Sequence, residues 1–240
     1  MSEYVPSFQI VHTLTGHVQA EPLFASEIDA LSYLSYEARG PRDWHVRVAT
    51  PPMSYVESRA RDFAIKRHGD QKYGANPYAV HLDAVFQVLC DFGLPEDERV
   101  AGWLHDTVED TGATPEDIRI QFGPRVEKLV WAVSGIGKNR KERKRDAFDK
   151  MRALVGRTPP SWRLADGSPW DGRQALMSDA EGAVNLKLAD RIANVESSLR
   201  DGPGLLDMYR KEMAEFEAML GGHGLRRMWS RLRNALSFRP

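Results

Sequence analysis

The segment LHDTVEDT, at residues 104–111, places one imidazole and three carboxylates within eight residues. His105 and Glu109 are four residues apart, and so are Asp106 and Asp110. In a continuous helix each pair would stack on one face, which would give two neighbouring polar columns. The segment contains no Lys or Arg, so the crowded carboxylates would raise one another's pKa values unless a cation lay between them.

The residues around this acidic segment are apolar, which indicates that part of it is buried. Ala101, Trp103 and Leu104 precede His105, and Val108 lies within the segment. A single His on an apolar face is more often a hydrogen-bonded core residue than a ligand. Buried carboxylates without a counter-charge are costly, however, and a divalent metal ion relieves that cost. The combination of residues therefore favours a metal site.

Two further polar residues lie in apolar surroundings. His81 follows Tyr-Ala-Val at the start of an amphipathic segment, and Asp190 lies within the apolar VNLKLADRIANV. With His105 and Asp106 they would give a metal site of two imidazoles and two carboxylates. This mixture of ligands suits Mn²⁺, Fe²⁺ or Zn²⁺ at an open catalytic site.

From about residue 53 onward, apolar residues recur with the 3.6-residue period of helices, which predicts a mainly α, multi-helix bundle. Pro77 is expected in the first turn of its helix, and Thr114 and Gly123 are expected to cap another. The Gly-, Pro- and Trp-containing stretch 156–176 predicts an irregular loop. Helices are expected over residues 56–68, 77–93, 94–112, 114–123, 124–135, 139–156, 179–199, 205–220 and 225–238.

Residues 1–52 have a different pattern and predict a small α+β appendage. Residues 8–15 and 44–50 are rich in β-forming residues and are expected to form strands, with a helix over 26–40 between them. Pro51 and Pro52 close this segment. We therefore expect two units, an N-terminal appendage of residues 1–52 and a main domain of residues 53–240.

The composition excludes several classes of protein. The 240 residues include 33 Lys and Arg against 34 Asp and Glu, a net charge of -1 that gives no overall attraction to nucleic acid or to an anionic membrane. Cys90 is the only cysteine, so no intrachain disulfide can form, which is typical of a cytoplasmic protein. No signal peptide or membrane span is apparent. The oligomeric state cannot be inferred from the sequence.

These motifs resemble the HD-domain phosphohydrolases, specifically the RelA/SpoT-type (p)ppGpp hydrolases. RHGDQKYGANPYAVH, LHDTVEDT, the FG of QFGPRVEKLV and KLADRIAN occur in the order of that family, over about residues 55–199. The resemblance implies an HD-domain helical bundle. It also implies that a metal ion, usually Mn²⁺, is held by His81, His105, Asp106 and Asp190.

The resemblance further implies a reaction. Glu109 and Asp110 match the residues that activate water, which removes pyrophosphate from the 3′ position of (p)ppGpp and leaves GDP or GTP. At this length, we expect no room for the synthetase domain of the longer relatives, and therefore hydrolysis without synthesis. Two alternatives stay open: hydrolysis of another nucleotide (an adenine alarmone, NADPH or a nucleoside monophosphate), or a nucleotide sensor without turnover.

Several residues are candidates for binding the nucleotide. Lys72-Tyr73 matches the family's basic pair only in part, and Glu196 stands where the family commonly has Arg, so the resemblance implies the metal site but not which base is recognised. The basic run 138–145 is either a solvated helix face or part of the phosphate pocket. The substrate-binding candidates are Lys72, Tyr73, Lys187, Asn194, Arg143 and Lys144.

The C-terminal segment 225–238 is basic and amphipathic, with apolar residues on one stripe. Such a helix can bind a membrane surface. Packing of the apolar stripe against the bundle is more common, and we expect packing here.

Overall fold

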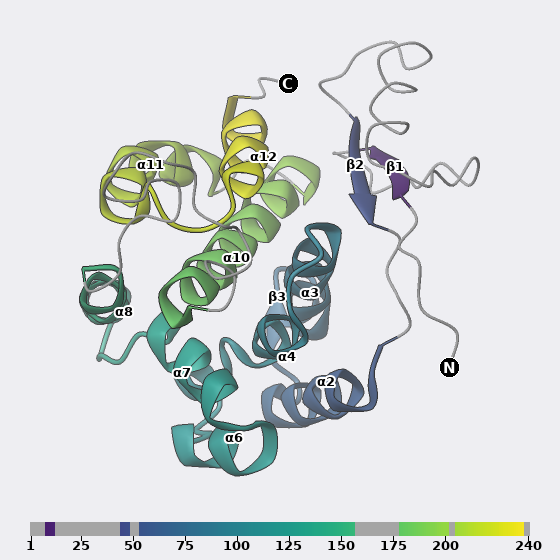
Figure 1. The fold of residues 1–240 in the computed structure, drawn as a ribbon, viewed down its shortest axis with the longest axis vertical. Coiled ribbons are helices and arrows are strands. Elements are labelled where there is room, and N and C mark those ends of the chain that lie inside the picture. Colours follow the sequence, from purple (N-terminus) through teal and green to yellow (C-terminus); the bar gives the residue numbers. More distant parts are fainter. Residues whose placement is uncertain (1–7, 13–43, 49–52, 157–177, 202–204, 238–240) are drawn as a thin grey trace.

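The computed structural model describes residues 8–12, 44–48, 53–156, 178–201 and 205–237, which are mainly helical (Figure 1). The predicted helix over 26–40 and nearly all of the predicted loop 156–176 lie outside these residues. The helices are Tyr55–His68 (α2), Ala79–Asp91 (α3), Glu96–Leu104 (α4), Thr107–Asp110 (α5), Pro115–Phe122 (α6), Pro124–Val133 (α7), Arg140–Val155 (α8), Asp179–Asp201 (α10), Leu206–Leu220 (α11) and Arg226–Ser237 (α12). The predicted mainly α bundle is confirmed.

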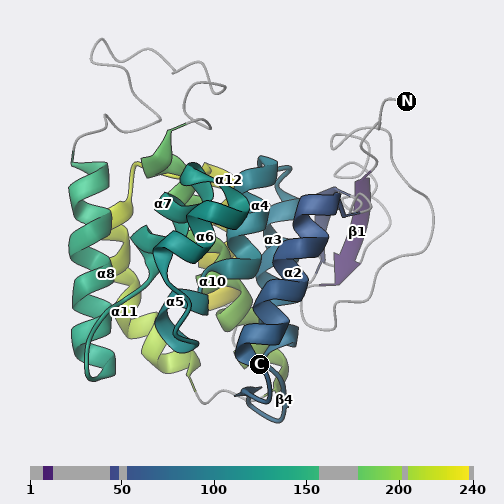
Figure 2. The same ribbon diagram turned by 90° about the horizontal axis from the view of Figure 1, so that it is seen from below.

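Helix α10 lies at the centre of the bundle and contacts α3, α4, α7, α8, α11 and α12. Its Leu186, Leu188 and Ile192 are fully buried, because neighbouring helices cover it on several sides. Figure 2 shows α8 at one edge of the bundle and α2 near the opposite edge. Asp190, in the middle of α10, is therefore carried to the interior between them.

The predicted helix over residues 94–112 is not continuous, and this expectation was wrong. It breaks at His105 and Asp106, which form a turn between α4 and α5. Other groups accept or donate the hydrogen bonds at the break: the Thr107 hydroxyl donates to the Leu104 carbonyl at 2.7 Å, and the Ser134 hydroxyl lies 3.3 Å from the His105 carbonyl. The turn changes the direction of the acidic segment.

The segment before α3 is a hairpin rather than the start of a helix. Lys72–Tyr73 (β3) pairs antiparallel with Asn76–Pro77 (β4), so Pro77 lies in a strand and not in the first helical turn. Gly74 has a φ of 58°, a conformation that favours glycine, within the turn. The hairpin places Tyr73 over the start of α3.

The two predicted N-terminal strands are present as Phe8–His12 (β1) and Trp44–Val48 (β2), which pair antiparallel. Strand β2 contacts α3, and Figure 1 shows the β1–β2 pair beside the bundle. The hairpin they form lies outside the helical core.

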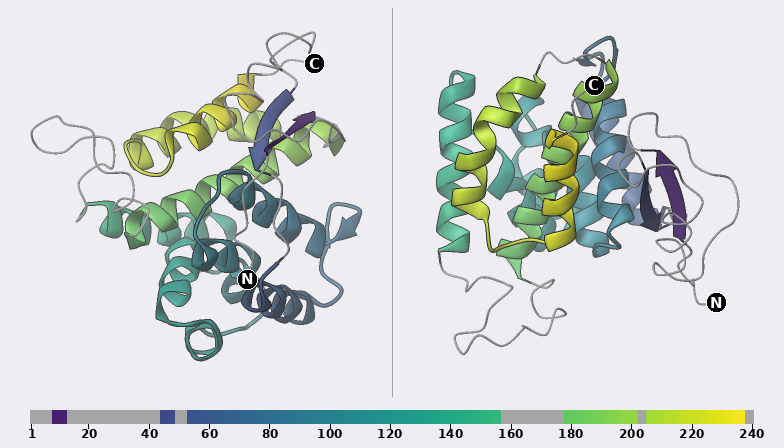
Figure 3. Two further views of the ribbon diagram at one scale, coloured as in Figure 1. Left: turned by 45° about the vertical axis from the view of Figure 1, so that its right-hand side comes forward. Right: turned by 90° about the horizontal axis from the view of Figure 1, so that it is seen from above.

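Helix α12 packs along α10, which Figure 3 shows in two views. Its Met228, Trp229 and Leu232 are fully buried, which confirms the expected packing of the apolar stripe. Among the described helices, none combines the length and the apolar character that crossing a membrane requires.

A buried ion-pair network also fastens α12. Arg231 donates to Glu196 at 2.7 and 2.9 Å and to Asp91 at 2.6 Å, which joins α12 to α10 and α3. Glu196 therefore has a structural partner in this chain.

Candidate active site

Four side chains from three parts of the fold converge on one point. His81 (α3) and His105 (the turn after α4) face each other with their Nε2 atoms 3.3 Å apart. Asp106 Oδ2 lies 2.9 Å from His105 Nε2 and 3.6 Å from His81 Nε2. Asp190 Oδ1, from α10, lies 3.6 Å from His81 Nε2 and 3.9 Å from His105 Nε2. The structure thus brings together all four residues that the sequence predicted as ligands.

The arrangement fits a divalent cation. Metal–ligand bonds of about 2.0 to 2.2 Å place neighbouring donor atoms roughly 3 to 3.5 Å apart, close to the spacing found here. His105 Nδ1 lies 2.9 Å from the Gly102 carbonyl, which leaves Nε2 free to act as a ligand. Burial opposes protonation of His105, but Asp106 and Asp190 outweigh it and raise its pKa to about 9. His81, His105 and Asp106 form a group that could hold a metal ion.

Two tyrosines support this centre. The Tyr78 hydroxyl donates to Asp106 Oδ2 at 2.5 Å. The Tyr73 ring stacks on His81, with ring centroids 4.8 Å apart. Sequence reasoning assigned no role to Tyr78, although it belongs to the Pro-Tyr pair that precedes His81 in the motif.

Asp190 is held by residues that the sequence predicted as substrate ligands. Lys187 Nζ donates to Asp190 Oδ2 at 2.8 Å, and Asn194 Nδ2 donates to Asp190 Oδ1 at 2.5 Å. The Tyr73 hydroxyl in turn donates to Asn194 Oδ1 at 2.8 Å. These three residues therefore orient a metal-site carboxylate in this structure.

Glu109 and Asp110 are consecutive residues of α5, so their side chains leave the helix about 100° apart and reach different partners. Glu109 accepts a hydrogen bond from the Gly135 N–H at 2.7 Å and lies 2.9 Å from Arg143 Nε. Asp110 accepts from Gln71 Nε2 at 3.0 Å. Burial raises the pKa of Glu109, only partly opposed by the Gly135 N–H. A raised pKa suits a group that takes up a proton near neutral pH.

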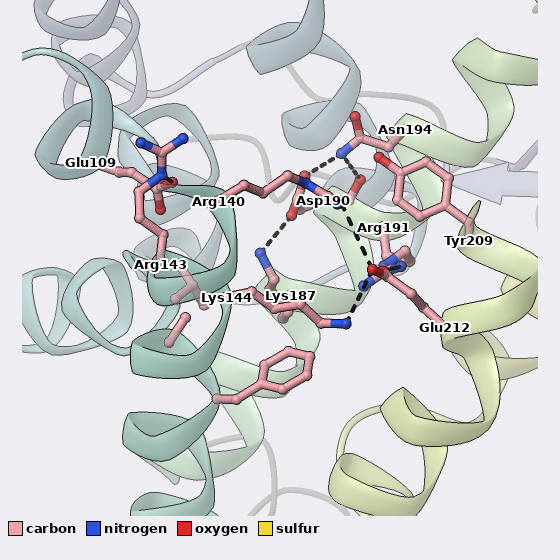
Figure 4. A pocket seen from close by; sticks show the side chains of 13 residues that line it. Glu109, Arg140, Arg143, Lys144, Lys187, Asp190, Arg191, Asn194, Tyr209 and Glu212 are labelled. Carbon is pink, nitrogen blue, oxygen red and sulfur yellow. Dashed lines mark hydrogen bonds and ion pairs between the residues drawn. The ribbon is translucent and has the colours of Figure 1, made fainter. Parts of the chain in front are cut away.

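A pocket of ≈ 640 Å³, including the part open to solvent, lies beside Asp190 between α8, α10 and α11 (Figure 4). Glu109 and Asp190 line it, so the acid of α5 and a predicted metal ligand both face this space. Lys72 is exposed and is not among the lining residues. The cationic lining residues are Arg140, Arg143, Lys144, Lys187 and Arg191.

Sequence reasoning missed part of this pocket. Tyr209 and Glu212 line it from α11, beyond the stretch over which the motifs resemble the family. Nothing in the sequence marks them, because their role depends on how α11 packs beside α8. Arg140 and Arg191 also line the pocket. Both carried a sequence signal, because Arg140 belongs to the basic run 138–145 and Arg191 belongs to the motif KLADR.

Comparison with known proteins agrees with this geometry. Residues 60–202 match the family model described as HD domain. Over 140 residues the chain is 34% identical to a protein of Aquifex aeolicus named guanosine-3′,5′-bis(diphosphate) 3′-pyrophosphohydrolase, covering 58% of this chain and 17% of that protein. Over 82 residues it is 38% identical to a GTP pyrophosphokinase of Brucella ovis, covering 34% of this chain and 11% of that protein.

The chain therefore spans less than a fifth of the length of these relatives. Among solved structures, a metazoan SpoT orthologue that hydrolyses ppGpp matches with a TM-score of 0.53 at 23% identity, covering 78% of this chain and 96% of that one. The shared fold therefore covers more of the chain than residues 55–199, over which the motifs occur. Since the family model covers more than half of the chain, the chain belongs to the HD-domain family.

Proposed function

We propose that this protein is a metal-dependent hydrolase that removes the 3′-pyrophosphate of (p)ppGpp-like alarmones. The products are pyrophosphate and GDP or GTP. One observation carries the proposal: the metal-site residue Asp190, the acid Glu109 and the cations of α8 all line one pocket. The name of the Aquifex aeolicus relative supports the same reaction.

The side chains divide the work in this proposal. Arg143, Lys144 and Lys187 bind the anionic diphosphate, which needs several cations. Glu109 accepts a proton from the attacking water, and Asp110 helps to orient that water. The water oxygen bonds to the phosphorus attached to the 3′ oxygen, that phosphorus–oxygen bond breaks, and the 3′ oxygen takes up a proton.

A metal ion bound by His81, His105, Asp106 and Asp190 would act as a Lewis acid on the phosphate and lower the pKa of water. We propose Mn²⁺ as that ion, because the resemblance to the RelA/SpoT-type hydrolases implies it. A set of two imidazoles and two carboxylates also suits Fe²⁺ and Zn²⁺.

Nucleoside recognition is proposed for the hairpin and α10. Lys72 is exposed on β3. The Tyr73 hydroxyl donates a hydrogen bond to Asn194, which in turn donates one to Asp190. We further propose that residues 1–52 are a unit added to a hydrolase domain of residues 53–240. The lone cysteine supports a cytoplasmic location.

Chromatographic analysis of products from ppGpp in the presence of Mn²⁺ tests the function. We expect equal amounts of GDP and pyrophosphate. Glu109→Gln should retain Mn²⁺ binding and lose turnover, whereas Asp106→Asn should lose Mn²⁺ binding. Full pyrophosphate release by Glu109→Gln would remove Glu109 from the proposed role.

The same assay with ppApp, NADPH and nucleoside monophosphates separates the alternatives, since pyrophosphate and phosphate are different products. Tight ppGpp binding with no product after hours in Mn²⁺ would instead indicate a sensor.

A further inference from the structure

Three cationic side chains in the pocket converge on one carboxylate that sequence reasoning did not consider. Lys144 Nζ (α8) lies 3.1 Å from Glu212 Oε1, and Arg140 Nη2 (α8) lies 3.9 Å from the same oxygen. Arg191 Nη1 (α10) donates to Glu212 Oε2 at 2.9 Å. Figure 4 shows these side chains meeting at Glu212 from two different helices.

Glu212 is held firmly in this position. Its side chain is only 16% exposed, and Arg191 is fixed between the rings of Tyr209 and Phe216, 4.8 and 4.7 Å from their centroids. Burial acts to raise the pKa of Glu212, but the hydrogen bonds from Arg191 and Lys144 outweigh it and hold that pKa below its ordinary value. Glu212 is therefore an anion at neutral pH.

Cations that converge from separate helices on two oxygens form the kind of site that binds a phosphate group. Here the chain supplies the anion itself. A ligand phosphate that reached Lys144 and Arg140 would compete with Glu212 for the same donors, and its charge would be repelled by the carboxylate.

We propose that Glu212 occupies a phosphate subsite of the pocket and determines how tightly the pocket binds diphosphate groups. This identification of the ligand rests on the proposed function. Because Glu212 competes with the ligand, its presence weakens binding of the free pyrophosphate product and so favours its release. Glu212 is thus a specificity-determining residue that acts through charge and not through the chemical step.

Titration of inorganic pyrophosphate into the full chain, followed by isothermal calorimetry without added metal ion, tests this proposal. We expect Glu212→Gln to bind pyrophosphate about 5 to 10 times more tightly than the unmodified protein, because a negative charge leaves the site while an acceptor oxygen stays. Glu212→Asp, which keeps the charge but withdraws it by one methylene, should show a smaller gain.

Glu215→Gln is the matched control. Glu215 also pairs with Lys144, at 3.0 Å, but its side chain is 64% exposed and it does not line the pocket. Water and salt screen such a charge, so its removal should change pyrophosphate affinity by less than about twofold.

Unchanged or weaker pyrophosphate binding by Glu212→Gln would overturn the proposal, as would absence of binding by both proteins. If Glu212→Gln does not fold, by circular dichroism, Glu212→Asp decides by the same criterion. The outcome is separable from the proposed function: tighter pyrophosphate binding without ppGpp hydrolysis would contradict the reaction alone, and hydrolysis without tighter binding would contradict the role of Glu212 alone.

Discussion

The backbone N–H of Gly135 donates a 2.7 Å hydrogen bond to the carboxylate of Glu109. Gly135 lies in the loop between α7 and α8, and Glu109 lies in α5, so this bond joins the acidic turn to the loop that leads into the cationic helix. Arg143, 2.9 Å from the other Glu109 oxygen, closes the same connection from α8. The position of the proposed base therefore depends on this loop.

Gly135→Ala should lower kcat for ppGpp hydrolysis by roughly 10- to 100-fold, since small displacements of a reacting group have effects of that size. A Cβ at this position would lie 2.3 Å from the backbone oxygen of Arg143, so the loop must shift and carry the N–H away from Glu109. Mn²⁺ affinity should stay unchanged. Steady-state kinetics and calorimetric Mn²⁺ titration check the two statements.

The control for this variant is Gly156→Ala, at the end of α8, where the nearest atom to an added Cβ is the Arg152 oxygen at 3.0 Å. It should keep kcat within about twofold, because it lies outside the site. A Gly135→Ala protein with unchanged kcat would show that the loop does not position Glu109.

Tyr78→Phe should weaken Mn²⁺ binding by about 10- to 100-fold, the usual effect of removing a hydrogen bond to a metal-ligating carboxylate. The Tyr78 hydroxyl donates to Asp106 at 2.5 Å and so fixes the orientation of that carboxylate. Calorimetric titration with Mn²⁺ measures the change. Tyr55→Phe, at an exposed position on α2, is the control and should bind Mn²⁺ as the unmodified protein does. Equal affinity in both variants would refute a role for Tyr78.

The convergence of the four predicted ligands could be anticipated from sequence because their signal is local. His105 and Asp106 are adjacent, and Asp190 is the single carboxylate of the apolar stretch VNLKLADRIANV, whose burial the hydrophobic period already indicates. The apolar surroundings of Asp190 indicated a buried helix, and the structure places that helix, α10, at the centre of the bundle. These are properties of short windows of sequence, which is why the expectation and the structure agree.

The pocket could not be predicted in the same way. Glu212 lies on a helix whose charged residues look like an ordinary solvated face, and only the packing of α11 beside α8 turns it toward Lys144. The break at His105 was missed for a related reason. Good helical period continues through it, and the bond from the Ser134 hydroxyl to the His105 carbonyl comes from a distant segment.

Arg231→Met should lower the free energy of unfolding by about 3 to 5 kcal/mol, because it leaves two carboxylates buried without their counter-charge. Arg231 donates to Glu196 and to Asp91, and the Asp91 side chain is only 3% exposed. Urea denaturation followed by circular dichroism measures the loss. Lys211→Met, at an exposed position on α11, should change the value by less than about 0.5 kcal/mol. Similar small losses in both variants would mean that the network contributes little.

Glu98 should make the protein less stable as pH rises from about 4.5 to about 7. Burial raises the pKa of Glu98 from 4.5 to about 7, although Asn185 donates to it at 3.1 Å and Arg125 lies 3.4 Å away. Between these two pH values the folded protein holds a proton on Glu98 that the unfolded chain has lost. The free energy of unfolding therefore falls with rising pH across this window, by on the order of 3 kcal/mol, and the contribution is fully lost above about pH 7.

Glu98→Gln isolates this effect, because glutamine does not titrate. Urea denaturation of both proteins at pH 5 and at pH 8 gives two differences, in which the contributions of all other titrating groups cancel. We expect the free energy of unfolding of the variant to fall less between these pH values than that of the unmodified protein, whatever its absolute value. Equal falls would show that the Glu98 carboxyl ionises at an ordinary pH, and that Arg125 and Asn185 stabilise its charge in full despite its burial.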